Sequence, residues 1–149
     1  MNPGDLAPEI SLVVHANDKL SLAKLYRERP VVLFFYPRDN TSVCTKEACS
    51  FRDAYEDFVA AGAAVVGISA SSAASHEQFA AKYRLPFLLA TDADGSVRRA
   101  FGVSDTLGFI PKRVTFVIDR QGVIRHQFSA LFAAEKHVQE ALAAVRALA

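Results

Sequence analysis

The fold is set by residues 31–53, which read VVLFFYPRDNTSVCTKEACSFRD and contain both cysteines of the 149-residue chain. Residues 31–36 are all apolar or aromatic, a composition that predicts a strand buried on both faces within a sheet covered by helices. Pro37 ends this strand because proline has no N–H to donate to a neighbouring strand. The polar residues 38–41 predict a loop, so the chain leaves the sheet just before its first cysteine.

A helix carrying both cysteines follows the loop. Apolar residues recur at helical spacing from about Ser42, and the helix is predicted to end at Gly62. Asn40, Thr41 or Ser42 can each accept hydrogen bonds from the free N–H groups at its start. Cys44 then lies in the first turn, where those N–H groups and the helix dipole favour a thiolate, the nucleophilic form of cysteine. The alternative is a buried, unreactive cysteine of the core.

Cys49 lies five residues after Cys44. On an ideal helix this spacing separates the two Cα atoms by about 8–9 Å, whereas a disulfide needs roughly 4.4–6.8 Å. The two cysteines therefore cannot bond while the helix is intact, and a disulfide between them requires local unwinding. Such a requirement makes little sense for a structural disulfide but suits a catalytic one.

The motif Pro37-x-x-x-Thr41-x-x-Cys44, with a second cysteine at Cys49, resembles the active-site segment of the peroxiredoxins. It is most similar to the atypical two-cysteine PrxQ type, also called bacterioferritin comigratory protein. One departure is visible, because members of this type commonly carry Pro-Gly just before the first cysteine and this chain has Ser42-Val43. The departure bears on the stiffness of the loop and the rate of unwinding, and not on the chemistry.

The resemblance implies a role for each matched residue. Cys44 would be the peroxidatic cysteine, which attacks the peroxide O–O bond and becomes a sulfenic acid, and Cys49 would be the resolving cysteine. Thr41 would hydrogen-bond both the thiolate and the peroxide, and Pro37 would shield the sulfenic acid from water. Preorganised donors suit this chemistry, because charge moves to the leaving oxygen as the O–O bond breaks.

A second matched element, residues 113–116 (RVTF), resembles the Arg-x-Thr-Phe sequence that follows the active-site loop in peroxiredoxins. By this resemblance Arg113 would reach Cys44, where its permanent charge would stabilise a thiolate and donate to an oxyanion. Glu47 would brace Arg113. Without the resemblance, both residues would be ordinary solvated charges, Arg113 before a strand and Glu47 on a helix.

Other cysteine chemistries fit the sequence less well. A Cys-His hydrolase needs a histidine base, but no recognisable motif positions any of the 4 histidines. Of these, His76 is predicted to be a solvated residue of a helix. A thioredoxin-type disulfide reductase would show Cys-x-x-Cys, and this chain has four residues between its cysteines. A non-catalytic binding module would not need Thr41, Cys44 and Arg113 together.

The remaining predicted elements complete an α/β sandwich. They are a hairpin within 10–20, a helix at 22–26, strands at 63–69, 87–90, 115–119 and 123–128, and helices starting at Ser71 or Ser72, at 96–101 and at about 133–148. Strands and helices alternate before a C-terminal hairpin and helix, which predicts a thioredoxin-like sandwich with a central mixed β-sheet flanked by helices. We expect one domain over residues 1–149.

The composition excludes several classes of protein. The 17 Lys and Arg residues nearly balance the 16 Asp and Glu residues, so charge gives no basis for binding nucleic acid or an anionic membrane. No apolar run approaches the roughly 20 residues of a membrane span, and the first residues show no secretory signal. Two cysteines are too few for a disulfide scaffold, and their spacing fits no standard zinc site. We therefore expect a soluble cytoplasmic enzyme.

By the resemblance, the predicted activity is that of an antioxidant peroxidase that reduces hydrogen peroxide and organic hydroperoxides. Its cycle would pass through a Cys44 sulfenic acid and an intrachain Cys44–Cys49 disulfide, which thioredoxin or a glutaredoxin-like dithiol protein would reduce. No metal, haem or flavin is required, and a monomer would suffice because both cysteines share one chain. The alternative is a thioredoxin-like disulfide oxidoreductase or binding module without peroxidase activity.

Overall fold

The computed structural model describes residues 2–14, 18–37, 39, 42–103, 105–106, 110–111, 113–130 and 134–148. Within these residues, strands in the order β2-β1-β5-β4-β3-β8-β9 form one mixed sheet. The strands are β1 (Ser11–Val14), β2 (Asp18–Ser21), β3 (Val31–Phe35), β4 (Ala64–Ser69), β5 (Leu88–Thr91), β8 (Val114–Ile118) and β9 (Ile124–Ser129). A separate two-stranded ribbon joins β6 (Asp105–Thr106) to β7 (Ile110–Pro111).

The predicted strand at 31–36 is the centre of this sheet. All five residues of β3 are buried, because the strand is parallel to β4 on one side and antiparallel to β8 on the other. Its side chains alternate between two cores, with Val32 and Phe34 in one and Leu33 and Phe35 in the other. The apolar composition of the strand is therefore explained by burial on both faces.

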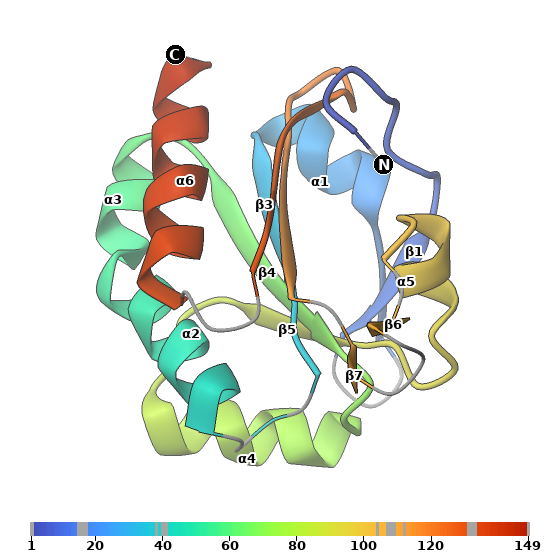
Figure 1. Cartoon of the computed structure of the whole chain (residues 1–149), viewed down its shortest axis with the longest axis vertical. Coiled ribbons are helices and arrows are strands. Elements are labelled where there is room, and N and C mark those ends of the chain that lie inside the picture. Colours follow the sequence, from blue (N-terminus) through green and yellow to red (C-terminus); the bar gives the residue numbers. More distant parts are fainter. Residues whose placement is uncertain are drawn as a thin grey trace.

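The helices cover both faces of the sheet (Figure 1). They are α1 (Leu22–Glu28), α2 (Ser42–Asp53), α3 (Tyr55–Ala60), α4 (Ala73–Tyr83), α5 (Ser96–Ala100) and α6 (Ala134–Ala147). Residues of α2, α3, α4 and α6 share a core with Val32 and Phe34, and residues of α1 and α5 share the other core. This arrangement confirms the predicted thioredoxin-like sandwich, with a mixed sheet between helices.

The predicted cysteine helix is divided in two. The sequence pattern predicts one helix as far as Gly62, but α2 ends at Asp53 and α3 begins at Tyr55. Ala54 between them has φ −95° and ψ 2°, outside the helical region. Alanine is the best helix former, so nothing in the local sequence marks this break. Gly62 has φ +83°, the left-handed conformation expected of a glycine that ends a helix.

The helix α4 begins as predicted. Ser72 is its N-cap, and its side chain accepts a hydrogen bond from the backbone N–H of Ser75.

Among the helices of the described residues, none combines the length and the apolar character that crossing a membrane requires.

Candidate active site

Cys44 lies in the first turn of α2 and its side chain is fully buried. Tyr36 extends the ladder of β3 by donating its backbone N–H to the carbonyl of Ile68 at 3.0 Å, and Pro37 then takes the chain out of the sheet. A helix that starts a few residues later has its free N–H groups near the end of β3. The fold thus places the cysteine against the carboxyl end of the central strand.

Arg113 reaches this cysteine from the neighbouring strand. It immediately precedes β8, whose first residue, Val114, pairs with Phe35 at the end of β3. The Nη1 group of Arg113 donates a hydrogen bond to the Cys44 sulfur at 3.0 Å, and the side chain is buried. The contact expected from the family resemblance is therefore present, and the alternative of a solvated arginine is wrong.

Cys49 lies on the same helix and is partly exposed. Both cysteines are free thiols in this structure. Burial raises the pKa of the Cys49 thiol, with the charge of Asp53 adding to the shift and Arg52 opposing it. The second cysteine is therefore not activated while α2 is intact.

The other two predicted site residues belong to the loop between β3 and α2. Pro37 is half-buried directly after the strand. Thr41 lies outside the described residues, so its hydrogen bonds to thiolate and peroxide stay a prediction.

Glu47 is fully buried, which contradicts the alternative of an exposed helix charge. Neither of its carboxyl oxygens has a hydrogen-bond partner among the described residues, so a hydrogen-bonded brace to Arg113 is absent there. Burial raises the pKa of Glu47 to about 8, although the charge of Arg113 opposes the shift. The carboxyl group is therefore largely neutral at neutral pH.

His137 of α6 is the nearest polar neighbour of Glu47, with 3.7 Å between its Nε2 and the Oε2 of the glutamate. Its Nδ1 lies 2.8 Å from the hydroxyl of Thr115, and its Nε2 lies 2.9 Å from the carbonyl of Ala130. Burial lowers the pKa of His137, aided by the charge of Arg113 and opposed by the hydrogen bond to Ala130. The contact with Glu47 is therefore one between neutral groups rather than an ion pair.

A second buried cluster lies under the loop. Asp39 accepts hydrogen bonds from the Tyr36 hydroxyl at 2.6 Å and the Ser75 hydroxyl at 2.9 Å. The Nδ1 of His76 lies 2.7 Å from the same carboxylate. His76 is 4% exposed, so the prediction that it is a solvated helix residue is wrong. Its side chain is drawn inward because a loop residue distant in sequence provides a charged partner.

Residues 3–127 match the AhpC/TSA family. The chloroplastic peroxiredoxin Q of Triticum aestivum is 45% identical over 149 residues, which is 99% of this chain and 68% of that protein. Among solved structures, peroxidoxin BcpB from Mycobacterium tuberculosis superposes with a TM-score of 0.92 at 38% identity, covering 100% of this chain and 99% of that one. A mutant peroxiredoxin Q from Xanthomonas campestris superposes with a TM-score of 0.84 at 28% identity, covering 94% and 92%.

The chain is a peroxiredoxin of the AhpC/TSA family. It is a thiol-dependent peroxidase with a thioredoxin-like fold, and its similarity to peroxiredoxin Q confirms the type inferred from the cysteine spacing. The alternative of a Cys-His hydrolase finds no support in this peroxiredoxin. Of the three described histidines, His76 contacts Asp39, His126 contacts Glu140 and His137 contacts Thr115, and none contacts Cys44.

Two features of the peroxiredoxin site have no signal in the local sequence. The pairing of His76 with Asp39 joins residues 37 positions apart, and only the tertiary fold brings them together. The burial of His137 depends on how α6 docks on α2 and β8. In the part of the chain that the structure describes, no group of three or more His, Cys, Asp or Glu side chains is placed to bind a metal ion.

Proposed function

We propose that this peroxiredoxin reduces hydrogen peroxide and organic hydroperoxides by a cycle that starts at Cys44. The observation that carries the proposal is the hydrogen bond of 3.0 Å from the Arg113 guanidinium to the Cys44 sulfur. A charged donor at this distance stabilises negative charge on the sulfur. The thiolate attacks the terminal peroxide oxygen, so that an S–O bond forms as the O–O bond breaks. The other oxygen takes up a proton equivalent to the one that Cys44 released on ionisation, and leaves as water or an alcohol. The product at the enzyme is a Cys44 sulfenic acid.

The charges around Arg113 support a thiolate at Cys44. A guanidinium stays protonated, and a buried charge needs a compensating partner. Glu47 is close enough to feel the charge of Arg113, but burial raises its pKa to about 8 and leaves it mostly neutral. The sulfur of Cys44, in direct contact with the guanidinium, is the group suited to balance it.

The second step joins the two cysteines. The Cys49 thiol attacks the sulfenic sulfur, an intrachain disulfide forms, and hydroxide leaves with the thiol proton as water. Five residues of intact helix hold the two Cα atoms about 8–9 Å apart, so α2 must open locally before this step. A dithiol protein such as thioredoxin or a glutaredoxin-like reductant then attacks the disulfide and restores both thiols.

The loop residues have supporting roles in this proposal. Thr41 hydrogen-bonds the thiolate and the peroxide, and Pro37 keeps water from the sulfenic acid. Because one chain holds both cysteines, a monomer completes the cycle without a partner subunit. The cytoplasmic location expected from the sequence stays a prediction.

The intact mass after one equivalent of hydrogen peroxide tests the cycle. The wild-type protein should lose two hydrogens and both free thiols without forming a dimer. The Cys49→Ser variant should instead gain one oxygen at Cys44, trapped by a sulfenic acid reagent, and should turn over slowly with thioredoxin. A Cys44→Ser variant that still consumes peroxide would overturn the assignment, as would a wild-type protein that keeps both thiols.

A further inference from the structure

The ring of His76 faces a hydrogen-bond acceptor at each nitrogen. Its Nδ1 lies 2.7 Å from the Oδ2 of Asp39, and its Nε2 lies 3.1 Å from the carbonyl of Ala90 on β5. Carbonyl and carboxylate oxygens only accept, whereas a neutral imidazole has one N–H to donate. An N–H at Nδ1 donates to the carboxylate of Asp39, and an N–H at Nε2 donates to the carbonyl of Ala90.

Asp39 is held in its ionised form by the same cluster. Burial alone would raise the pKa of Asp39, but hydrogen bonds from His76, Tyr36 and Ser75, together with the charge of His76, outweigh burial and lower it. The two side chains form a buried hydrogen-bonded pair, with 4% of His76 and 8% of Asp39 exposed. Hydrogen bonds that are satisfied in a buried cluster make the positions of their side chains rigid, so this pair restricts Asp39 to one geometry.

The geometry that it fixes is that of the active-site loop. Asp39 stands two residues after Pro37 and five residues before Cys44. Its backbone N–H also donates to the Ser71 hydroxyl at 3.0 Å, so both its main chain and its side chain are tied to the start of α4. Asp39 is therefore fastened to the start of α4, a helix that carries none of the reacting groups.

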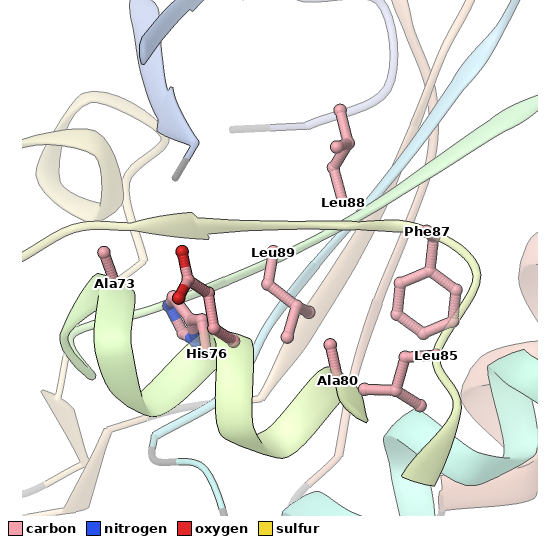
Figure 2. A pocket seen from close by; sticks show the side chains of 8 residues that line it. Ala73, His76, Ala80, Leu85, Phe87, Leu88 and Leu89 are labelled. Atoms are coloured by element: carbon pink, nitrogen blue, oxygen red, sulfur yellow. The ribbon is translucent and has the colours of Figure 1, made fainter. Parts of the chain in front are cut away.

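The His76 side chain borders a pocket between α4 and β5. The pocket has a volume of about 280 Å³, and its other lining residues are Ala73, Glu77, Ala80, Leu85, Phe87, Leu88 and Leu89. Figure 2 shows His76 on α4 beneath β5, with Leu89 pointing from the strand toward the helix. The hydrogen bonds to Asp39 and Ala90 fix the direction in which the two ring nitrogens point.

We propose that His76 is a positioning residue of the peroxidase reaction, which acts through Asp39 to hold the loop between Pro37 and Cys44. The inference rests on the proposed function, because it concerns the attack of Cys44 on peroxide. A reacting group displaced by about 1 Å costs on the order of 10²-fold in rate. Loss of the contact between His76 and Asp39 should therefore slow the oxidation of Cys44 with little effect on the fold.

Two conservative variants separate the contacts of the ring. The amide nitrogen of His76→Asn falls near the position of Nδ1 and can still donate to Asp39. The amide nitrogen of His76→Gln falls near the position of Nε2 and can donate only to Ala90. Both are made in a Cys49→Ser background, where hydrogen peroxide oxidises Cys44 in a single step measured by stopped-flow. We expect the Asn variant to keep a rate constant within about threefold of the background and the Gln variant to lose roughly 10- to 100-fold.

Controls keep this test separate from stability and from the proposed function. The melting temperature of each variant is measured alongside, and His126→Asn, at a histidine paired with Glu140 away from the loop, should leave the rate unchanged. Asp39→Asn tests the same contact from its other partner. It should lower the rate constant of Cys44 oxidation by a similar factor, and the double variant with His76→Gln should be no slower than either single variant. Equal rates in the Asn and Gln variants, or losses that follow melting temperature alone, would overturn the positioning role. Failure of the Cys49→Ser background itself to react with peroxide would instead overturn the proposed function.

Discussion

The guanidinium of Arg113 is buried, and among the described residues it donates to a sulfur atom, that of Cys44, at 3.0 Å. Arginine suits such a place because its charge persists when buried and because its rigid fork places an N–H on a fixed line. A lysine there would carry a compact, strongly hydrated charge that is more easily lost on burial. The reaction can therefore use both the permanent charge of the guanidinium and the fixed direction of its N–H group toward the sulfur.

At this residue scale we predict that Arg113→Lys slows the reaction of Cys44 with peroxide by about 10²-fold or more, the range seen when one charge-stabilising donor is removed from an active site. The measurement is the rate constant of Cys44 oxidation in the Cys49→Ser background. Arg120→Lys is the matched control, because Arg120 is exposed beyond the other end of β8. Unchanged rates in the Arg113→Lys variant would show that the contact with sulfur is incidental.

The helix α2 has to be stable in one step of the proposed cycle and open in the next. Phe51 holds it closed, since its ring stacks on Phe34 of β3 with centroids 4.4 Å apart and planes at 11°. Glu47 acts in the opposite sense, because its carboxyl group is buried without a hydrogen-bond partner among the described residues. The segment between the two cysteines thus contains a group that water would stabilise once the helix opens.

At the scale of this element we predict a pH dependence with a defined sign. The pKa of Glu47 is raised from 4.5 to about 8 in the folded protein, so the folded state keeps a proton that the unfolded state releases. The contribution of protonated Glu47 to the free energy of unfolding is complete below pH 4.5 and is lost as pH rises toward about 8. One proton can change the free energy of unfolding by at most about 1.4 kcal/mol per pH unit. Opening of α2 should become easier over the same range.

The difference in unfolding free energy between wild type and Glu47→Gln isolates this effect, because glutamine does not titrate. Urea unfolding of both proteins across the range from pH 4.5 to 8 should show the wild type losing stability relative to the variant as pH rises. Glu56→Gln, which changes an exposed carboxyl on α3, should show no such trend. A difference that is flat, or that grows in favour of the wild type, would contradict the predicted linkage.

The elements show what the sequence could predict and what it could not. The order of β3, loop and α2 follows from an apolar run, a proline and a helical pattern, which are all local signals. The contact between Arg113 and Cys44 was expected only from a family motif, since local chemistry favours a solvated arginine. Glu47 and His76 look like surface residues of helices. They are buried because α2 packs against α6 and because Asp39 reaches α4 from the loop.

At the scale of the whole molecule, the sheet brings the two halves of the site together. Phe35, the last residue of β3, pairs with Val114, the first residue of β8. The chain that leads to Cys44 and the arginine before β8 therefore leave the sheet at the same ends of the two strands. Arg113 and Cys44 are 69 residues apart in the chain. The antiparallel pairing of β3 and β8 therefore determines the distance between Arg113 and Cys44. Substitutions in the core that shift β3 should change this distance.

Gly67 of β4 lies against the side chains of Phe34 and Leu89 in this core. A Cβ atom added there would be 2.7 Å from the Cζ of Phe34 and 2.9 Å from the Cδ2 of Leu89. Real Cβ contacts are almost never so short, so one of these side chains would have to move. The Phe34 ring also stacks on Phe51 of α2. The absence of a side chain at Gly67 therefore lets β3, β5 and α2 pack closely around β4.

We therefore predict that Gly67→Ala lowers the free energy of unfolding by about 1–3 kcal/mol, the usual cost of overfilling a packed core. The reason can be tested with a second substitution. In a Phe34→Leu background the smaller side chain leaves room for the new methyl group, so Gly67→Ala should cost less there, and the two changes should be coupled by about 0.5 kcal/mol or more. Urea unfolding of the four proteins gives the coupling directly. Costs that simply add would mean that the contact with Phe34 is not the reason glycine is needed, and that Leu89 or the backbone of β4 sets the limit.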